Sequence, residues 1–273
     1  MRLATYKYEN NEYVGIIEED QIYQLENQDM MDVIINGIKK TDIKIDLDDV
    51  DLLAPIKYPK QDIICLGLNY LEHAKESAKF KNEQFEKRAD AVYFSKRVNE
   101  ATGPNAGINA HRDICDSLDY EVELAVIIGK DCLNVSETDA LDYVFGYTIL
   151  NDFSARNIQN KHKQWYFGKS LDGFTAMGPA ILTMDELDEI ELDIKSYVNG
   201  ELRQSSNTKN MIFDIPFVIS ELSKGMTLKA GTIISTGTPS GVGMGFNPPK
   251  FLKKGDVVTC VIEKIGVLEN TIL

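Results

Sequence analysis

Short hydrophobic runs separated by turn residues dominate the pattern along the chain. Their β-branched and aromatic content predicts strands rather than helices. We expect strands at residues 3–8, 13–17, 63–67, 91–95, 147–150, 180–183, 194–198 and 232–235, and a closing hairpin over 252–266. Asn199-Gly200 follows one of these runs and is typical of a hairpin turn. Runs of strands broken by turns argue against a doubly wound sheet and predict an α+β, β-dominated fold.

Few segments have a helical pattern. Helices are expected at residues 29–38, 68–76, 136–145 and 214–225, and an acidic linker over 46–51. The helix over 214–225 has the best signals, because Asp214 is a typical N-cap and Gly225 a typical stop. Its apolar positions form one stripe, which we expect to be buried.

One predicted strand, over residues 119–130, carries two acids. Side chains alternate along a strand, so Glu121 and Glu123 point to the same face, and that face continues into Ala125 and Ile127. Both faces are therefore expected to be at least partly covered. Two adjacent buried carboxylates would cost several kcal/mol, as an order of magnitude, and a divalent cation would remove that cost. The strand alone equally allows a half-exposed, solvated acidic face.

A second segment, over residues 146–159, favours the metal site. Its β-rich start delivers Asp152 at the strand end, followed by Arg156 and Gln159. Three carboxylates with no cysteine and no necessary histidine form a hard-oxygen site. Such a site favours Mg²⁺, Mn²⁺ or Ca²⁺ over zinc.

His73 and Glu76 are three residues apart, so on a helix they share one face. A glutamate beside a histidine raises its basicity and fixes its tautomer, which suits a general base. The alternative is an ordinary surface helix, which the spacing alone favours. The charged stretch over 77–90 fits a lid or a solvated helix face equally well.

Two other stretches bear on a site. Residues 160–168 are basic and aromatic and are interpreted as a loop near the site mouth, with His162 solvated; His111 is interpreted as structural. The glycine-rich turn over 236–243 exposes backbone N–H groups that suit a carboxylate, or it is a plain tight turn. It does not indicate dinucleotide binding, because no βαβ context follows.

The composition of the chain limits the classes of molecule that the protein is expected to bind. The chain of 273 residues has a net charge of −14, which argues against nucleic acid and anionic membranes as partners. An anionic substrate therefore needs local positive charge. The four cysteines have no paired spacing, and no stretch is typical of a signal or a membrane span. We expect a cytoplasmic protein with reduced cysteines.

Four ordered motifs, DYEVELAVIIGK, NDFSARNIQ, GKSLDGFTAMGP and STGTPSGVG, carry a resemblance. From about Ile63 to the C-terminus the chain resembles the fumarylacetoacetate hydrolase family, in the bacterial branch of 2-hydroxyhepta-2,4-diene-1,7-dioate isomerases and acylpyruvases. The resemblance implies a rolled mixed β-sheet core, normally a homodimer. It also implies a small N-terminal β-rich subdomain, and we predict a boundary between residues 1–55 and a catalytic domain over 56–273.

The resemblance also implies residue roles. In the family a GxNYxxHxxE segment, matched here by Gly67, Asn69, Tyr70, His73 and Glu76, supplies a His–Glu dyad on a short helix. The lysine of the GKS motif, Lys169, would reach substrate oxygens, and Thr238 would bind the substrate carboxylate. Ser240 stands where lysine is commoner, and Leu171 and Gly173 stand where aromatic residues and threonine are commoner. These departures bear on pocket shape and rim charge.

The resulting hypothesis is a metal-dependent hydrolase that cleaves a C–C bond in acylpyruvate-type 2-oxo acids. Glu121, Glu123 and Asp152 would hold Mg²⁺ or Mn²⁺, with Ca²⁺ possible. His73, oriented by Glu76, would activate water, and Lys169 with Gln159 would stabilise the oxyanion. Arg156 would shape the pocket or pair with Asp152. The same motifs also fit a decarboxylase or an isomerase/tautomerase, and another class of protein, a non-catalytic metal-dependent oxo-acid binder, remains an alternative.

Overall fold

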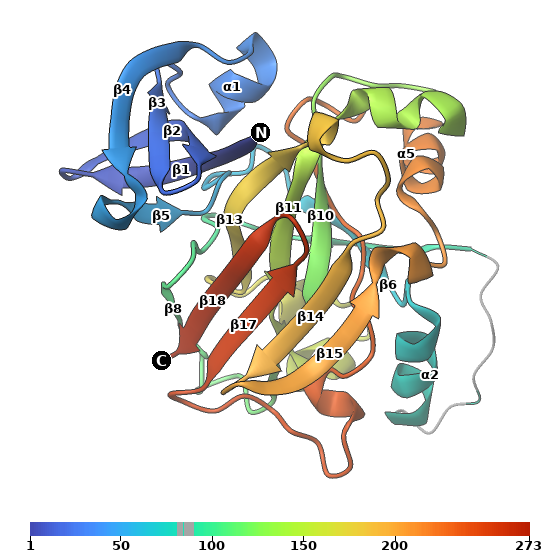
Figure 1. Cartoon of the computed structure of the whole chain (residues 1–273). Helices are drawn as coiled ribbons and strands as arrows, with labels where there is room; N and C mark the ends of the chain where they lie inside the picture. The colour runs from blue at the N-terminus through green and yellow to red at the C-terminus, as the bar shows by residue number, and fades with distance from the viewer. Residues whose placement is uncertain (81–83, 85–89) are drawn as a thin grey trace.

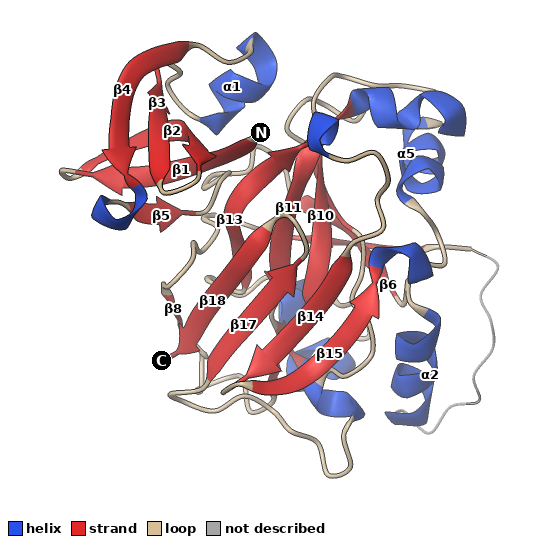
Figure 2. Ribbon diagram, in the orientation of Figure 1, coloured by secondary structure: helices blue, strands red, loops and turns tan. Residues whose placement is uncertain are grey.

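Strands dominate the structure, a computed structural model that describes residues 1–80, 84 and 90–273. Figure 1 shows the order of the elements along the chain, and Figure 2 shows how few helices accompany the sheets. Two large sheets lie one in front of the other in this view, with β14, β15, β17 and β18 in front of β10, β11 and β13.

The larger sheet has eleven strands within the described residues. Its order is β4 (Lys40–Asp46), β3 (Gln21–Leu25), β2 (Asn11–Glu18), β1 (Arg2–Tyr8), β13 (Thr175–Thr183), β11 (Val144–Asp152), β10 (Val122–Ile128), β16 (Ile233–Ser235), β6 (Ile63–Gly67) and β7 (Val92–Lys96), and β5 (Asp51–Leu53) pairs with β1. Its neighbours are antiparallel except for β16 and β6, which are parallel. The sheet is therefore mixed.

In the part of the chain that the structure describes, the second sheet has five strands. Its order is β15 (Glu201–Asn207), β14 (Asp193–Val198), β17 (Val257–Ile262), β18 (Gly266–Ile272) and β8 (Gly107–Ile108). A short pair is formed by β9 (Leu118–Asp119) and β12 (Ser154–Ala155). The closing hairpin expected over 252–266 is present but lies further along the chain, as the antiparallel pair β17–β18, whose second strand begins only at Gly266. Together the two sheets confirm a β-dominated mixed fold, and they do not close into a barrel.

The two faces of β10 belong to two cores. Leu124 and Val126 pack in the cluster that includes Ile194 and Val258 of the front sheet. Ala125 and Ile127 pack in a second cluster on the opposite face. The alternation expected from the sequence is thus present, and both faces are covered. Any polar side chain on the Ala125 face is therefore excluded from bulk water unless a cavity opens there.

The helices are short. They are α1 (Met30–Asn36), α2 (Leu71–Phe80), α3 (Arg156–Lys161), α4 (Tyr166–Lys169) and α5 (Ile215–Ser223), with 3₁₀ turns η1 (Leu47–Asp49), η2 (Glu137–Tyr143), η3 (Met184–Glu186), η4 (Thr208–Asn210) and η5 (Gly243–Gly245). The predicted helix over 214–225 is confirmed as α5, with Asp214 accepting a hydrogen bond from the Phe217 N–H at 2.9 Å. None of the described helices has both the length and the apolar character needed to cross a membrane.

Three local predictions are wrong in part. The helix over 136–145 is the 3₁₀ helix η2, and Val144 and Phe145 belong to β11, because pairing with β10 takes over at Val144. The linker over 46–51 contains η1 and the ends of two strands. The loop over 160–168 includes the end of α3 and most of α4. Short polar segments carry weak signals that neighbouring sheets override.

The charged stretch over 77–90 is described in part. Helix α2 continues through it as far as Phe80. Most of the remainder lies outside the described residues, so the choice between a lid and a solvated helix face stays a prediction.

The N-terminal strands join the main sheet rather than a separate one. Arg2 of β1 pairs with Leu182 of β13, and Leu3 pairs with Ile181. Figure 1 shows β1 to β5 with α1 at one corner of the molecule, beside β13. The division at residues 55 and 56 stays a prediction.

Replacing the cap of α5 should measurably destabilise the protein. Asp214→Ala leaves the Phe217 N–H without its side-chain acceptor and should lower the free energy of unfolding by about 1 kcal/mol. Urea denaturation is the measurement, and Asp42→Ala, at an exposed position of β4, is the control. Equal losses in the two variants would show that the cap contributes nothing.

Candidate functional site

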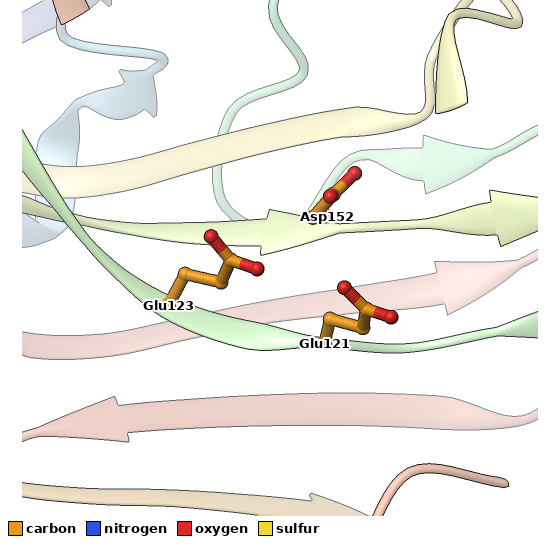
Figure 3. A group of neighbouring side chains, drawn as sticks. All are labelled: Glu121, Glu123 and Asp152. Carbon is orange, nitrogen blue, oxygen red and sulfur yellow. The ribbon is translucent and has the colours of Figure 1, made fainter. Parts of the chain in front are cut away.

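Three carboxylates meet where β10 and β11 lie side by side. Glu121 directly precedes β10, Glu123 lies on it, and Asp152 ends β11. Oxygen atoms of the three acids, one from each, lie within 4.8 Å of one another. Figure 3 shows Glu121 and Glu123 on the same side of one segment of the chain, next to Asp152 on the neighbouring segment. The exposed fractions are 5%, 1% and 0%, so the solvated acidic face is not what the chain forms.

Backbone pairing fixes this arrangement. The Asp152 N–H donates to the Glu121 carbonyl at 2.9 Å, and the Glu121 N–H donates to Asn151 Oδ1 at 3.0 Å. Because the strands are antiparallel, Glu123 lies opposite Leu150, two positions along from Glu121 and Asp152. The geometry of the acid trio is therefore set by the sheet rather than by mobile loops.

Three buried cations surround the acids. Lys169 Nζ donates to Glu121 at 2.7 Å and to Asp152 at 2.6 Å. Lys96 also donates to Asp152, and Arg156 Nη2 lies 2.6 Å from Glu121. Glu123 has a neutral environment instead: the Ser235 hydroxyl and, at 3.0 Å, the Gly237 N–H donate to it.

The pKa values of the two glutamates diverge for this reason. Burial, reinforced by the charges of Asp152 and Glu121, raises the pKa of Glu123 to about 8. Burial acts in the same direction on Glu121, but Lys169 and Arg156 outweigh it and lower its pKa to about 2. Glu123 is thus the acid whose negative charge is least compensated.

Arg156 does not pair with Asp152. Its Nε donates to Asp119 Oδ2 at 2.9 Å, its Nη1 donates to Gln159 at 3.0 Å, and its Nη2 contacts Glu121. The alternative in which Arg156 pairs with Asp152 is therefore wrong, because the cations that contact Asp152 are Lys96 and Lys169. All three nitrogens of Arg156 hold other site residues in place.

The donor set fits a hard divalent cation. Four carboxylates, those of Asp119, Glu121, Glu123 and Asp152, face three cationic side chains. With all four carboxylates ionised, one negative charge is left over where three carboxylate oxygens converge, and the raised pKa of Glu123 shows that the neighbouring groups do not compensate it. Carboxylate oxygens are the ligands that Mg²⁺, Mn²⁺ and Ca²⁺ prefer. Glu121, Glu123 and Asp152 could therefore hold such an ion.

The two residues of the expected dyad are in contact. His73 and Glu76 both lie on α2, and His73 Nδ1 is 3.0 Å from Glu76 Oε2. An ionised carboxylate only accepts hydrogen bonds, so the imidazole proton is assigned to Nδ1 and Nε2 is left as the acceptor. The other oxygen of Glu76 accepts the Gly241 N–H at 3.0 Å. Glu76 thus holds both the histidine and the glycine-rich turn.

Asn69 anchors the start of α2. Its amide donates to the carbonyls of Phe213 and Thr236, at 3.0 and 2.8 Å, and accepts from the Phe213 N–H at 2.8 Å. Because these bonds tie α2 to the end of β16, the dyad is held over the acid trio. This explains in physical terms why an asparagine stands two residues after Gly67.

One cavity collects most of the predicted site residues. The predicted site residues that line it are His73, Glu121, Glu123, Arg156, Gln159, Lys169 and Thr238. Glu76 and Asp152 lie behind it, in contact with His73 and Lys169 respectively. Trp165 also lines the cavity, so the stretch over 160–168 does lie at the site, while His162 is exposed.

Two further residues from the sequence analysis, Thr238 and His111, make hydrogen bonds that bear on their predicted roles. Thr238 Oγ1 donates to the Val122 carbonyl at 2.9 Å and accepts from Gln204 at 2.7 Å, so its hydroxyl proton is already used. Its role as carboxylate donor stays a prediction. His111 donates from Nε2 to the Asp172 carbonyl at 2.8 Å and contacts the Phe174 ring, which are structural contacts.

Sequence reasoning missed two residues of the network. Lys96, with no exposed surface, ends β7 and binds Asp152. Asp119 accepts from Arg156 and from the N–H groups of Gly243 and Met244, at 2.7 and 3.0 Å. The signal for Asp119 was present: it has the same parity as Glu121 and Glu123 along the acid strand.

Comparisons with known proteins agree with this fold. Residues 62–273 match the family described as fumarylacetoacetate (FAA) hydrolase C-terminal, and residues 1–55 match the family described as Rv2993c-like, N-terminal. A relative from Bacillus subtilis (strain 168), named oxaloacetate tautomerase YisK, is 48% identical over 227 residues, which cover 83% of this chain and 74% of that protein.

Two solved structures give the same picture. The fumarylacetoacetate hydrolase EaFAH from Exiguobacterium antarcticum is 40% identical, with a TM-score of 0.88 over 100% of this chain and 99% of that one. A 2-hydroxyhepta-2,4-diene-1,7-dioate isomerase from Mycobacterium marinum is 32% identical, with a TM-score of 0.82 over 100% of this chain and 98% of that one. The chain belongs to the fumarylacetoacetate hydrolase family of enzymes.

Proposed function

We propose that the protein is a metal-dependent tautomerase of small 2-oxo dicarboxylic acids, interconverting their keto and enol forms. The observation that carries the proposal is the His73–Glu76 dyad, which faces the same cavity as the buried acid trio and Lys169. A base and a positively charged group in one cavity suit the abstraction of a proton next to a carbonyl, because the positive charge stabilises the enolate that forms. The names of two relatives, an oxaloacetate tautomerase and a diene-dioate isomerase, favour this reaction class.

The proposed metal ligands are Glu121, Glu123 and Asp152, and the proposed ion is Mg²⁺ or Mn²⁺, with Ca²⁺ as a further candidate. Such an ion, when bound, polarises a carbonyl and favours the enolate form of a 2-oxo acid. The protein's part is to deliver three convergent oxygens from a rigid strand pair. Glu123, whose charge is otherwise balanced only by neutral donors, gains most from a cation.

His73 is the proposed proton carrier. Its Nδ1 proton is held by Glu76, so the lone pair of Nε2 is free to accept the proton from C3 of the substrate. The electrons of that C–H bond form the C2–C3 double bond, and the carbonyl pair moves onto O2. Return of the same proton from the imidazolium to O2 completes the enol. No net proton is taken from solvent.

Lys169 is the proposed stabiliser of the charge that develops on O2. Burial favours its neutral form, but the charges of Asp152 and Glu121 outweigh burial and raise the pKa of Lys169 above its ordinary value. The ammonium is therefore a poor acid and a persistent positive charge. Because it lines the cavity, it can donate a hydrogen bond to a substrate oxygen without surrendering its proton.

Charge balance supports an anionic substrate. When all of them are ionised, as metal binding requires, four buried carboxylates and three buried cations leave one negative charge. A divalent ion would change the sum to one positive charge, which an anionic oxo acid would offset. Burying an uncompensated charge is costly, so ion and substrate are expected to support each other's binding.

Cleavage of a C–C bond in acylpyruvates, which the sequence analysis predicts, is the second candidate. The free Nε2 of His73 is the observation that favours it, since the same lone pair could activate a water molecule. A decarboxylase would need the same enolate stabilisation. A non-catalytic oxo-acid binder would not need the dyad, and the preserved His73–Glu76 contact argues against it.

The cellular compartment, the assembly and the partners are also proposed. We propose a cytoplasmic homodimer that acts on a small 2-oxo acid, with neither nucleic acid nor membranes as partners. The buried free cysteines and the net charge of −14 support the reduced compartment and the absence of polyanionic partners. The dimer follows from the family resemblance.

Removing one carboxylate of the trio should abolish metal binding and turnover together. Glu123→Ala leaves two oxygens where three converged, and should weaken Mn²⁺ binding by about two orders of magnitude or more. Electron paramagnetic resonance titration with Mn²⁺ measures this. EDTA should likewise stop turnover, and Mg²⁺ or Mn²⁺ should restore it.

The control for this variant is Glu18→Ala, which removes an exposed glutamate at the end of β2. It should bind Mn²⁺ like the parent protein. Unchanged Mn²⁺ affinity in Glu123→Ala, with the protein folded, would refute the proposed ligand set.

Replacing His73 should separate chemistry from metal binding. His73→Gln removes the proton carrier and should lower the rate of enol-to-ketone conversion of oxaloacetate by about 10²-fold or more, with Mn²⁺ affinity unchanged. The ultraviolet absorbance of the enol follows the reaction, and an acylpyruvate assayed in parallel tests cleavage.

The matched control is His162→Gln at an exposed position, which should keep full activity. If the parent protein cleaves the acylpyruvate but has no tautomerase activity, and His73→Gln loses that cleavage, the second candidate is favoured. Full activity of His73→Gln on both substrates would refute the proposed catalytic role of the His73–Glu76 dyad.

A further inference from the structure

Ser235 contributes a buried hydroxyl to the face of the large sheet that carries Glu123. It lies opposite Ala125 where β16 pairs with β10, so its side chain is on the same face as Ala125 and Glu123. Ile233, two residues earlier on β16, packs in the apolar cluster on that face. Because Ser235 is 0% exposed, its hydroxyl must find its partner within the protein.

That partner is one particular oxygen of Glu123. The Ser235 hydroxyl and, at 3.0 Å, the Gly237 N–H both donate to Oε2 of Glu123. The described residues give Oε1 no hydrogen bond, yet Oε1 is not one of their fully enclosed atoms without a partner. It is therefore open to the cavity that Glu123 lines. One oxygen of this acid is fixed and the other is presented to the cavity.

The other two acids of the trio follow the same pattern. Lys96 holds Oδ1 of Asp152, and Oδ2 of Asp152 lies 2.6 Å from Lys169 Nζ. Arg156 Nη2 lies 2.6 Å from Oε1 of Glu121, and Oε2 of Glu121 lies 2.7 Å from the same Lys169 Nζ. One oxygen of each acid thus has a separate donor, while the remaining two meet at a lysine that lines the cavity. The strand pair therefore presents one oxygen from each acid.

The number of presented oxygens bears on which ion fits. Ca²⁺ takes about six to eight oxygen ligands and often binds both oxygens of a carboxylate, whereas Mg²⁺ demands near-ideal octahedral geometry and keeps several waters. To bind through both oxygens, Glu123 would have to give up two hydrogen bonds in a buried site, which is costly. The fixed Oε2 therefore favours the smaller ion.

Ser235 differs from the other donors in a useful way. Lys96 and Arg156 are cations, so their removal would change the charge of the site as well as its geometry. Gly237 donates through its backbone. The hydroxyl of Ser235 is neutral, so its loss changes only how firmly Oε2 of Glu123 is held.

We propose that Ser235 is a positioning residue that sets the preference of the acid trio for Mg²⁺ or Mn²⁺ over Ca²⁺. It acts through Glu123, whose Oε2 it holds so that this acid offers the ion one oxygen. The inference rests on the proposed metal ligands, and it narrows the proposed ion from three candidates to two.

Mn²⁺ binding to the full chain without substrate, followed by electron paramagnetic resonance, tests this role independently of activity. Displacement of Mn²⁺ by Mg²⁺ and by Ca²⁺, in separate titrations, gives the dissociation constants of both ions. Ser235→Ala should weaken Mg²⁺ binding about tenfold or more, because an oriented ligand is lost. Ca²⁺ binding should be unchanged or stronger, because Glu123 can then turn both oxygens to the larger ion.

The matched control is Ser223→Ala, which removes an equally buried hydroxyl that donates to the Ser220 carbonyl on α5. It should bind all three ions like the parent. If Ser235→Ala fails to fold, the isosteric pair Ser235→Thr and Ser235→Val decides. Threonine keeps the hydroxyl and should keep the preference for Mg²⁺, and valine should lose it.

The two possible failures have different signatures. An unchanged ratio of the Mg²⁺ and Ca²⁺ dissociation constants in Ser235→Ala, or the same change in the Ser223→Ala control, overturns the role of Ser235 and leaves the metal site standing. A parent protein that binds no Mn²⁺ overturns the proposed ligand set itself.

Discussion

The structure depends on the burial of three like charges in one small volume. Glu121, Glu123 and Asp152 are almost wholly excluded from water, and their oxygens converge. Two unit charges 4 Å apart repel by about 4 kcal/mol at an effective dielectric constant of 20, so three such charges cannot be tolerated without counter-charges. Lys169, Lys96 and Arg156 supply those counter-charges, and Ser235 and Gly237 supply neutral donors.

The strand order of the large sheet brings the counter-charges and donors to the three acids. β10 and β11 deliver the acids as antiparallel neighbours, and β16 and β6 continue the same sheet on the other side of β10. The end of β16 supplies the donors to Glu123, and β7, paired with β6, supplies Lys96. Groups far apart in the sequence therefore reach one point because the strands that carry them are ordered β11-β10-β16-β6-β7. The parallel β16–β6 pair makes that order possible.

Local pattern was enough to predict the acid trio, and it was not enough to predict its counter-charges. Alternation along the strand placed Glu121 and Glu123 on one covered face, and Asp152 followed from the strand end. Lys96 could not be placed in this way, because its contact depends on which strands are neighbours, and periodicity does not report that order. Similarly, the 136–145 segment had good helix signals but ends in β11, since pairing with β10 from Val144 onward outweighs a short helix. The pairing of Arg156 with Asp119 was missed although Asp119 has the parity of the two glutamates.

The glycine-rich turn connects the acid trio to the dyad. Asp119 is bound by Arg156, which also binds Glu121, and Asp119 in turn accepts the N–H groups of Gly243 and Met244. At the other end of the turn, Glu76 accepts the Gly241 N–H and holds His73. A Cβ at Gly243 would lie 2.5 Å from Asp119 Oδ1, and one at Gly245 would lie 2.0 Å from Glu76 Oε1, so only glycine lets both carboxylates approach the backbone. The spacing of these glycines is thus a packing requirement of two buried acids. Because those acids belong to the two halves of the site, the position of the His73–Glu76 pair and the charge balance around the acid trio are set by one short segment.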